Sequence, residues 1–400
     1  MNKINNALHR ARKSGNGELG KKNIPEGPLS PLYLSLQLVS DFYQFHLKSD
    51  EDALSYAMEQ RGISADIIQK FGIGFAPTGR RRLSRMANNP VWKKQFSGLF
   101  GSLDANQYEL AILNTLEITG VIKVNEEGAY SDSFPDRLIV PIKNEEGQTI
   151  SFGGRILPKY LENNPNRPKY LNGADSPLFS KSSVLFGLDL IANCQKSEFE
   201  SIIVEEGYMD VIASHTYDIT NCVATMGTAI NTGQILKLFE YTNKLVFCFD
   251  GDDAGVKAAK RAIINSLPAL HKSSTIEVVF LPSGEDPDSI LRKLNEEFSK
   301  EEAGTLMKRA LSGGIEVSDY LIGPFVDSEG LDWETQFERT HALMMHCLQK
   351  LPPDCDTRTK LRQSIDIKVQ ERAANNAQFG DEQAIELAEK LNSNCNLNPS

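Results

Sequence analysis

The feature that most constrains this chain of 400 residues is the stretch from Ser201 to Leu281, where strand and helix patterns alternate. Apolar runs typical of strands occupy 201–205, 222–225, 244–249 and 275–281, and helical spacing occupies 208–215, 232–241 and 254–267. Strands that alternate with helices of this length form parallel βαβ units with helices on both faces. The stretch therefore predicts an α/β layer with a parallel sheet.

Three of these predicted strands run into acidic segments. The segments are Glu205-Glu206-Gly207-Tyr208-Met209-Asp210, Asp250-Gly251-Asp252-Asp253-Ala254-Gly255 and Gly284-Glu285-Asp286-Pro287-Asp288. In an open α/β sheet, ligands bind outside the carboxyl ends of the strands, so we expect the three segments to converge. So much negative charge needs cations nearby, and carboxylate oxygens prefer hard cations such as Mg²⁺. The pattern predicts metal-assisted phosphoryl or nucleotidyl transfer.

The run Asp250-Gly251-Asp252 has two other interpretations when it is taken alone. Asp and Gly both favour turns, so a lone Asp-Gly-Asp is more often a turn than a metal site. An EF-hand-like calcium loop needs a Glu at its twelfth position, and that position counted from Asp250 is Arg261. The calcium loop is therefore excluded, and the functional interpretation depends on the other two acidic segments.

The net charge of −10 disfavours nucleic acid as a partner unless positive charge is concentrated locally. Residues 78–103 contain no acid and carry Arg80, Arg81, Arg82, Arg85, Lys93 and Lys94, with Trp92 and Phe96 in the same stretch. A second basic group consists of Arg155, Lys159, Arg167, Lys169 and Lys181. Either group alone is compatible with a solvated charged face or with a phosphate-binding surface.

The patterns change on both sides of the α/β stretch. Residues 1–32 are polar and lack an apolar period, which predicts a flexible basic arm. Apolar spacing over 34–62 predicts short helices, and the runs 138–142 and 149–152 predict an antiparallel hairpin. Beyond about residue 300 the chain reads as helical and acidic.

The six cysteines are scattered without a C-x-x-C pair, which disfavours a disulfide framework and a structural zinc site. His341, His346 and Cys347 form a His/Cys cluster, but the two histidines are five apart on a predicted helix and face different directions. The longest apolar runs fall short of the roughly 20 residues that span a bilayer, and no secretory signal is evident. We expect a cytoplasmic chain without a membrane partner.

Five further motifs precede the acidic segments. They are Phe71-Gly72-Ile73-Gly74-Phe75-Ala76-Pro77, Arg137-Leu138-Ile139-Val140-Pro141-Ile142, Phe152-Gly153-Gly154-Arg155, Pro168-Lys169-Tyr170-Leu171-Asn172 and Leu185-Phe186-Gly187-Leu188. In this order they resemble the N-terminal part of the RNA polymerase core of bacterial DnaG-type DNA primases. The acidic segments resemble the TOPRIM domain of the same family. With Gly227-Thr228-Ala229 included, the resemblance runs from about Leu34 to Lys293.

The resemblance implies that Glu206, Asp250 and Asp252 are catalytic and bind Mg²⁺ or Mn²⁺, with no zinc expected. It also implies that Asp210, Asp286 and Asp288 complete the acidic cluster, either as further metal ligands or as residues that support the ligands. Basic residues that match family positions facing the acidic cluster would bind nucleotide phosphates or the template; these are Arg155, Lys169, Lys181 and Arg137. Fixed cations at such positions stabilise charge that develops on a transferred phosphoryl group.

The resemblance also implies a division of the chain, whose overall fold class is α/β. The expected parts are a flexible basic arm (1–32), an α+β N-terminal subdomain of the primase core (33–195), a TOPRIM domain with a parallel sheet (196–296), a helical subdomain (297–375) and a C-terminal tail (376–400). No cysteine in residues 1–33 matches the family's zinc ribbon, and we expect the helicase-binding bundle to be missing as well. Glu205 stands where the family usually has an apolar residue, so it either perturbs the site or points outward.

The function implied is a DNA-directed RNA polymerase of primase type, which makes short RNA primers on single-stranded DNA during replication. The partners implied are the DNA template, ribonucleoside triphosphates, and either a replicative helicase of the primosome or a separate zinc-ribbon initiation protein. Two alternatives stay open: DNA cleavage of the TOPRIM type, and a non-catalytic relic that binds single-stranded DNA.

Overall fold

The computed structural model describes residues 27, 29–101, 103–192, 194, 199–322, 346–364 and 367. It forms two compact units, one of residues 1–229 and 284–309 and the other of residues 230–283 and 310–400. The division between the units runs through the expected TOPRIM domain, and the domain boundaries given above stay predictions. Most of the expected basic arm, the whole expected tail and His341 lie outside the described residues.

The first unit begins with one long helix, α2 (Ser30–Ser49), where the sequence predicts short helices. The prediction was wrong for this segment, because nothing breaks the helical pattern after Pro31, which occupies the first turn; short helices follow only beyond Ser49. Asp50 then ends α2 and caps α3 (Glu51–Ser55) by accepting the Ala53 N–H. A short π-helix, η1 (Tyr56–Gln60), follows and is closed by Gly62 in a left-handed conformation.

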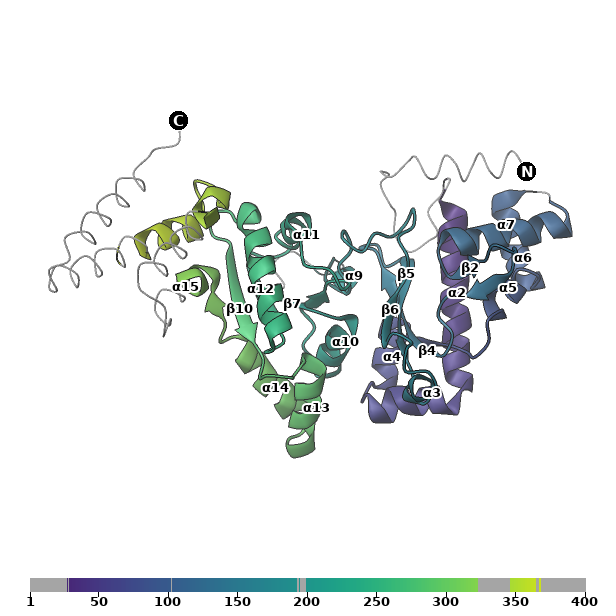
Figure 1. Cartoon of the computed structure of the whole chain (residues 1–400), viewed down its shortest axis with the longest axis horizontal. Coiled ribbons are helices and arrows are strands. Elements are labelled where there is room, and N and C mark those ends of the chain that lie inside the picture. The colour runs from purple at the N-terminus through teal and green to yellow at the C-terminus, as the bar shows by residue number, and fades with distance from the viewer. Residues whose placement is uncertain are drawn as a thin grey trace. The chain divides into compact units, whose positions relative to one another are not determined.

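An antiparallel sheet of order β1-β4-β5-β6 packs against α2. Its strands are β1 (Gly74–Ala76), β4 (Arg137–Lys143), β5 (Thr149–Ile156) and β6 (Tyr170–Asn172). The expected hairpin is confirmed as β4 paired with β5. A Cβ atom at Gly74 would lie 2.6 Å from Tyr43 of α2, so the close approach of helix and strand requires glycine there. Figure 1 shows α2 beside these strands.

Smaller elements of the first unit surround this layer. They are α4 (Ala65–Phe71), α5 (Arg82–Met86), α6 (Pro90–Phe100), α7 (Ala105–Ile118), β2 (Ile122–Val124), β3 (Tyr130–Asp132), α8 (Pro158–Glu162) and α9 (Leu188–Ala192). Helices α6 and α7 pack on α2, and Trp92 and Phe96 of α6 are buried in the shared core. These two aromatic side chains, which lie within the first basic group, are therefore core residues.

The first unit also contains a parallel pair of strands, β7 (Ile202–Glu205) and β8 (Cys222–Ala224), with α10 (Tyr208–Thr216) between them in the chain. These elements confirm the first predicted βαβ unit. Helix α13 (Pro287–Glu297) packs on α10 and leads to α14 (Lys300–Leu311). Cys222 is fully buried, as expected of a small apolar side chain.

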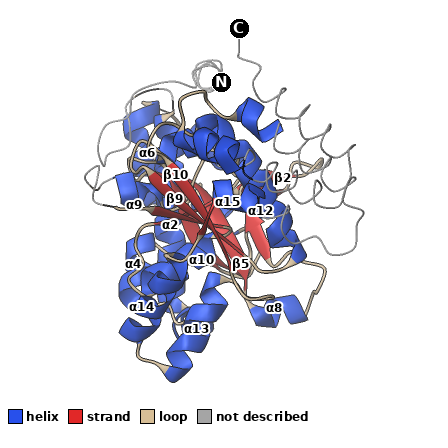
Figure 2. Cartoon of the chain, turned by 90° about the vertical axis from the view of Figure 1, so that its left-hand side faces the viewer, coloured by secondary structure: helices blue, strands red, loops and turns tan. Residues whose placement is uncertain are grey.

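The second unit has a parallel pair of its own. Its elements are α11 (Thr232–Leu238), β9 (Lys244–Phe249), α12 (Asp253–Ser266), the 3₁₀ turn η2 (Leu267–Ala269), β10 (Thr275–Phe280), β11 (Ile315–Glu316) and α15 (Val317–Ile322). Strands β9 and β10 lie side by side in parallel, as Figure 2 shows. Their near-continuous apolar sequences are typical of parallel strands. The short antiparallel strand β11 at the edge of β10 was not predicted.

The α/β fold class predicted from the sequence is confirmed by these elements. Within the described ranges, no helix has both the length and the apolar character needed to cross a membrane.

Candidate active site

The first acidic segment forms a tight turn between β7 and α10. Gly207 precedes α10, and its N–H donates to Asp210 Oδ2 at 3.0 Å. A Cβ atom at Gly207 would lie 3.0 Å from that same oxygen, so glycine suits the turn. Asp210 is 9 % exposed, whereas Glu206 is partly exposed at the end of β7. The turn therefore places both predicted metal ligands at the carboxyl end of one strand.

Glu205, just before this turn, points inward. It is 1 % exposed, and its Oε1 accepts a hydrogen bond from Ser214 Oγ of α10 at 2.6 Å. Its Oε2 is buried without a hydrogen-bond partner among the described residues. Burial raises the pKa of Glu205 to about 8, and the Ser214 hydrogen bond opposes this only in part. The alternative that Glu205 points outward is therefore wrong.

We expect Glu205→Gln to stabilise the protein at neutral and alkaline pH. The folded pKa lies near 8, above the ordinary 4.5, so the folded state binds a proton that the unfolded state releases between these values. Stability then falls by about 1.4 kcal/mol per pH unit as the pH rises through this window. The neutral amide of glutamine removes that slope. Urea unfolding at several pH values measures the effect, and exposed Glu297, changed to Gln, is the control. If stability depends on pH in Glu205→Gln as it does in the parent chain, the raised pKa does not belong to Glu205.

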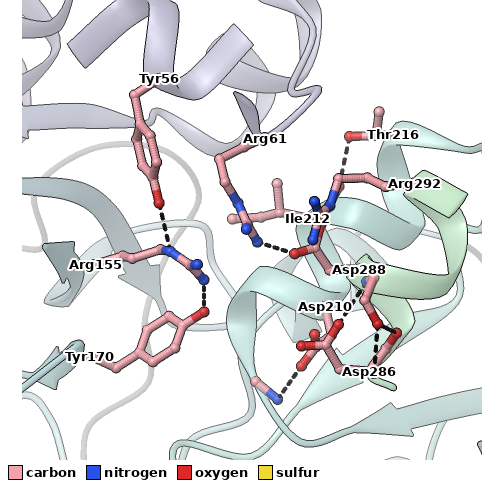
Figure 3. Close-up of polar contacts among 12 residues, drawn as sticks. Tyr56, Arg61, Arg155, Tyr170, Asp210, Ile212, Thr216, Asp286, Asp288 and Arg292 are labelled. Carbon is pink, nitrogen blue, oxygen red and sulfur yellow. Dashed lines mark hydrogen bonds and ion pairs between the residues drawn. The ribbon is translucent and has the colours of Figure 1, made fainter. Parts of the chain in front are cut away.

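The third acidic segment caps α13. Asp286 Oδ1 accepts the Ser289 N–H at 2.7 Å, and the Ser289 hydroxyl in turn accepts the Asp286 N–H. Glu285 pairs with Lys293 on the exposed side of the helix. Asp288 is 4 % exposed and pairs with Arg61 and Arg292, as Figure 3 shows for the Arg61 contact. The two aspartates thus have different environments although one residue separates them.

The second acidic segment lies in the second unit, after β9. Asp252 caps α12 by accepting the Gly255 N–H at 2.7 Å. A Cβ atom at Gly251 would lie 1.9 Å from the Leu281 carbonyl oxygen, and one at Gly255 would lie 2.1 Å from the Asp250 carbonyl oxygen. Both glycines are therefore required for the turn to fold tightly against the chain that follows β10.

The oxygen-only donor set of these segments fits a hard divalent cation and offers neither the thiolate nor the imidazole typical of zinc sites. Among the residues that the structure describes, no three His, Cys, Asp or Glu side chains lie close enough to hold a metal ion. The metal-ligand assignments made from the sequence therefore stay predictions.

A cluster of basic and aromatic side chains lies in the first unit (Figure 3). Arg155 Nε donates to the Tyr56 hydroxyl at 2.7 Å, and its Nη1 donates to the Tyr170 hydroxyl. The Arg155 guanidinium lies 4.9 Å from the centre of the Tyr170 ring, and Lys169 Nζ lies 5.6 Å from it. The Tyr170 ring packs edge to face on Tyr208. Tyr170 is 41 % exposed, so a positively charged aromatic surface faces solvent.

Lys169 lies within electrostatic reach of the third acidic segment. Burial lowers the pKa of Lys169, and the neighbouring charges of Arg155 and Arg61 lower it further. The charges of Asp286 and Asp288 raise the same pKa. Two of the predicted phosphate-binding residues, Arg155 and Lys169, are thus neighbours in the same unit as this acidic segment.

Arg137 is in a different environment from Arg155. It is 2 % exposed, and its guanidinium donates to the carbonyl oxygens of Gly154, Pro168 and Lys169. Burial lowers the pKa of Arg137 to about 10. The Arg137 side chain therefore holds the backbone of Pro168 and Lys169 against β5. Because it is buried, its guanidinium does not face a ligand in solvent.

The other basic residues divide between ion pairs and exposed positions. Arg167 pairs with Asp136, and Lys159 pairs with Asp52. The backbone N–H of Lys181 donates to Asp175, and its side chain has no contact with Arg155 or Lys169 among the described residues. The first basic group, 80–94, lies over α5, α6 and the loop before them, and its Arg and Lys side chains are largely exposed.

Sequence reasoning missed Tyr56, Arg61 and Tyr170. Tyr170 lies inside the motif Pro168-Lys169-Tyr170-Leu171-Asn172, so the aromatic residue beside a predicted phosphate-binding lysine was a usable signal. No local signal marks Tyr56 or Arg61, because their contacts join residues 99 and 227 positions apart.

Comparisons with known proteins agree with this arrangement. Residues 42–192 match the N-terminal domain of the DNA primase catalytic core, and residues 203–291 match a Toprim-like domain. A DNA primase of Legionella pneumophila is 38% identical over 280 residues, which are 70% of this chain and 43% of that protein. A crystal structure of a DNA primase domain from Pseudomonas aeruginosa aligns with a TM-score of 0.68 and 31% identity, covering 84% of this chain and 96% of that chain. A DnaG primase catalytic domain bound to single-stranded DNA aligns with a TM-score of 0.67 and 30% identity, covering 83% of this chain and 96% of that chain.

A primase catalytic-core domain followed by a Toprim-like domain defines the class to which this chain belongs. The chain belongs to the DnaG-type DNA primase family and corresponds to its catalytic core. It spans about half the length of the curated relatives that it matches, between 39% and 57% for the first three.

Proposed function

We propose that this chain is a DNA-templated RNA polymerase of primase type, which makes short RNA primers on single-stranded DNA from ribonucleoside triphosphates. The observation that carries the proposal is the cluster of Arg155, Lys169 and Tyr170 beside the third acidic segment in one unit. Positive charge and an exposed aromatic ring suit nucleotide phosphates and bases, while the carboxylates suit divalent cations. Membership of the primase family supports the same function.

In this proposal Glu206, Asp250 and Asp252 bind Mg²⁺ or Mn²⁺, and Asp210 and Asp286 support them. Held by these carboxylates, the cations would supply positive charge that offsets the negative charge developing on the phosphates during nucleotidyl transfer. The support for this ligand set is the sequence pattern of acidic segments that follow strands, together with the Toprim match. No protein nucleophile is needed, because the 3′-hydroxyl of the growing RNA loses its proton and attacks the α-phosphorus of the incoming triphosphate, and pyrophosphate leaves as the α–β phosphoanhydride bond breaks.

The basic side chains have distinct proposed roles. Arg155 is held by two tyrosine hydroxyls, so its guanidinium is oriented before a ligand arrives and loses little freedom on binding. Lys169 supplies a second positive charge for a phosphate. Arg137 acts indirectly by fixing the backbone that carries Lys169. Lys181 stays a predicted template contact.

The function is tested by incorporation of labelled ribonucleotides on circular single-stranded DNA with Mg²⁺ or Mn²⁺, with and without a supplied RNA primer. Synthesis without a primer supports an autonomous primase. Extension only from a supplied primer supports a polymerase core that depends on a separate initiation module. Nicked DNA or a phosphotyrosyl intermediate favours cleavage instead, and salt-sensitive DNA binding without incorporation favours the non-catalytic alternative.

We expect Tyr170→Ala to weaken binding of single-stranded DNA by about 5- to 150-fold, because stacking of a base on an aromatic ring contributes about 1–3 kcal/mol. Tyr170→Phe retains the ring and loses only the hydroxyl contact to Arg155, so most of the affinity is expected to remain. Fluorescence anisotropy with a labelled oligonucleotide measures both. Tyr108→Ala, on α7, is the matched control. Equal affinity of Tyr170→Ala and the parent chain rules out a stacking role.

The cellular setting follows from the same proposal. We place the chain in the cytoplasm with the replicating DNA, as the primase family membership supports. Association with a replicative helicase or with a separate zinc-ribbon protein stays a prediction, which co-purification with either candidate tests.

A further inference from the structure

Asp288 is a buried carboxylate with both oxygens in ion pairs. Its Oδ2 accepts from Arg61 Nη2, and its Oδ1 accepts from Arg292 Nε at 3.2 Å. The side chain of Asp288 is 5% exposed and that of Arg61 is 8% exposed. A divalent cation at Asp288 would have to displace at least one guanidinium from a site that is largely closed to water.

Asp286, two residues earlier, has a different environment. It is partly exposed and uses Oδ1 to cap α13, and the described part of the chain supplies no partner for its Oδ2. The motif Asp286-Pro287-Asp288 therefore combines a carboxylate that keeps an oxygen for a ligand with a carboxylate that is fully paired. The sequence places both in the acidic cluster without distinguishing a ligand from a supporting residue, because the two differ only in their tertiary contacts.

Arg61 comes from the π-helix η1, which also supplies Tyr56. The Arg61 N–H donates to the Tyr56 carbonyl at 3.1 Å, which is the five-residue spacing of a π-turn. The Tyr56 hydroxyl accepts from Arg155, while the Arg61 guanidinium binds Asp288 (Figure 3). One turn therefore connects the arginine proposed to bind phosphate with the third acidic segment.

We propose that Asp288 is a positioning residue and not a metal ligand, and that its ion pair with Arg61 sets the third acidic segment relative to Arg155 and Lys169. This inference deepens the proposed nucleotidyl transfer and rests on it for the role of Arg155. Mn²⁺ binding and thermal unfolding test the ion pair and the absence of metal at Asp288, and neither measurement requires catalytic activity.

The experiment compares Asp288→Asn, Arg61→Gln and their double variant with Asp250→Asn. The probe is Mn²⁺ alone, with the free ion measured by electron paramagnetic resonance. We expect Asp288→Asn and Arg61→Gln to leave the Mn²⁺ affinity within about twofold of the parent, because neither removes a ligand and their contacts are with each other, Arg292 and the Tyr56 carbonyl. Asp250→Asn removes a carboxylate ligand and is expected to weaken it at least about tenfold. A tenfold loss of Mn²⁺ affinity in Asp288→Asn with none in Arg61→Gln overturns the proposal.

Thermal unfolding of the same variants tests the pair. Asp288→Asn leaves the buried Arg61 without its partner, and Arg61→Gln leaves Asp288 with Arg292 alone, so we expect each to lower the melting temperature by about 5 °C or more. The melting temperature of the double variant is expected to fall by less than the sum of the falls in the two single variants. If the falls are additive, Asp288 and Arg61 do not interact directly. If Asp288→Asn does not fold, Arg61→Lys, which keeps a charge near Asp288, still reports on the pair through a smaller loss than Arg61→Gln.

A kinetic measurement separates positioning from simple stability. At a temperature where all variants are folded, Asp288→Asn and Arg61→Gln are expected to raise the KM for the ribonucleotide about fivefold or more at unchanged Mn²⁺ affinity. Unchanged KM in both variants overturns the positioning role. If the parent chain incorporates no ribonucleotide, the proposed function fails, while the Mn²⁺ and unfolding results still decide whether Asp288 is a ligand or a partner of Arg61.

Discussion

Asp250→Asn is expected to reduce ribonucleotide incorporation by about 100-fold or more, because cation stabilisation of the transferred phosphoryl group contributes several kcal/mol and each 1.36 kcal/mol is tenfold in rate. The fold should persist, since Asp250 is partly exposed and asparagine has nearly the same shape. Incorporation of labelled ribonucleotides on single-stranded DNA, with circular dichroism of the same samples, measures both effects.

The control for this variant is Asp253→Asn. Asp253 is exposed in the first turn of α12, in the same acidic segment, and no role in metal binding is assigned to it. We expect it to retain most of the activity. Normal synthesis by Asp250→Asn, or equal losses in the two variants, shows that Asp250 is not a ligand and that the segment acts only through its total charge.

Gly251→Ala is expected to destabilise the second unit by about 1–3 kcal/mol, which is the usual range for forcing extra atoms into a packed site. The added Cβ would lie 1.9 Å from the Leu281 carbonyl oxygen and 2.8 Å from the carbonyl carbon of Pro282, so the backbone itself must move. Urea unfolding of the parent chain and of Gly251→Ala measures the difference in their free energies of unfolding.

Gly313→Ala is the matched control in the same unit. Its new Cβ would meet the Ala310 carbonyl oxygen at 3.5 Å, an ordinary contact, so the expected change is within about 0.5 kcal/mol. If Gly251→Ala is as stable as the control, the turn after β9 does not pack against the chain after β10 as described.

The alternation of strands and helices from 201 to 281 was predictable because buried parallel strands have continuous apolar sequences that differ clearly from helical spacing. The structure confirms those elements to within a few residues. The edge strand β11 was missed, since a two-residue strand has too few positions to show a period. The π-helix η1 was missed for a different reason: its five-residue hydrogen bond has no sequence signature of its own.

The candidate site was predictable only in part. Acidic segments after strands, and a basic group that precedes them in the chain, were visible in the sequence, because the residue types themselves indicate the chemistry. Whether a charged side chain faces a ligand or the interior depends on contacts between distant parts of the chain. Arg137 and Glu205 are both buried, and Asp288 is paired with Arg61, which lies 227 positions away. Local pattern carries no information about such pairs.

The central claim is that this chain copies a DNA template into RNA, and the choice of nucleotide tests it most directly. With all four labelled ribonucleotides supplied separately, a poly(dT) template should direct incorporation of adenylate alone, and a poly(dC) template should direct guanylate alone. Both reactions should require Mg²⁺ or Mn²⁺ and should be lost in Asp250→Asn. Incorporation that ignores the template sequence, or DNA cleavage in place of incorporation, contradicts the account.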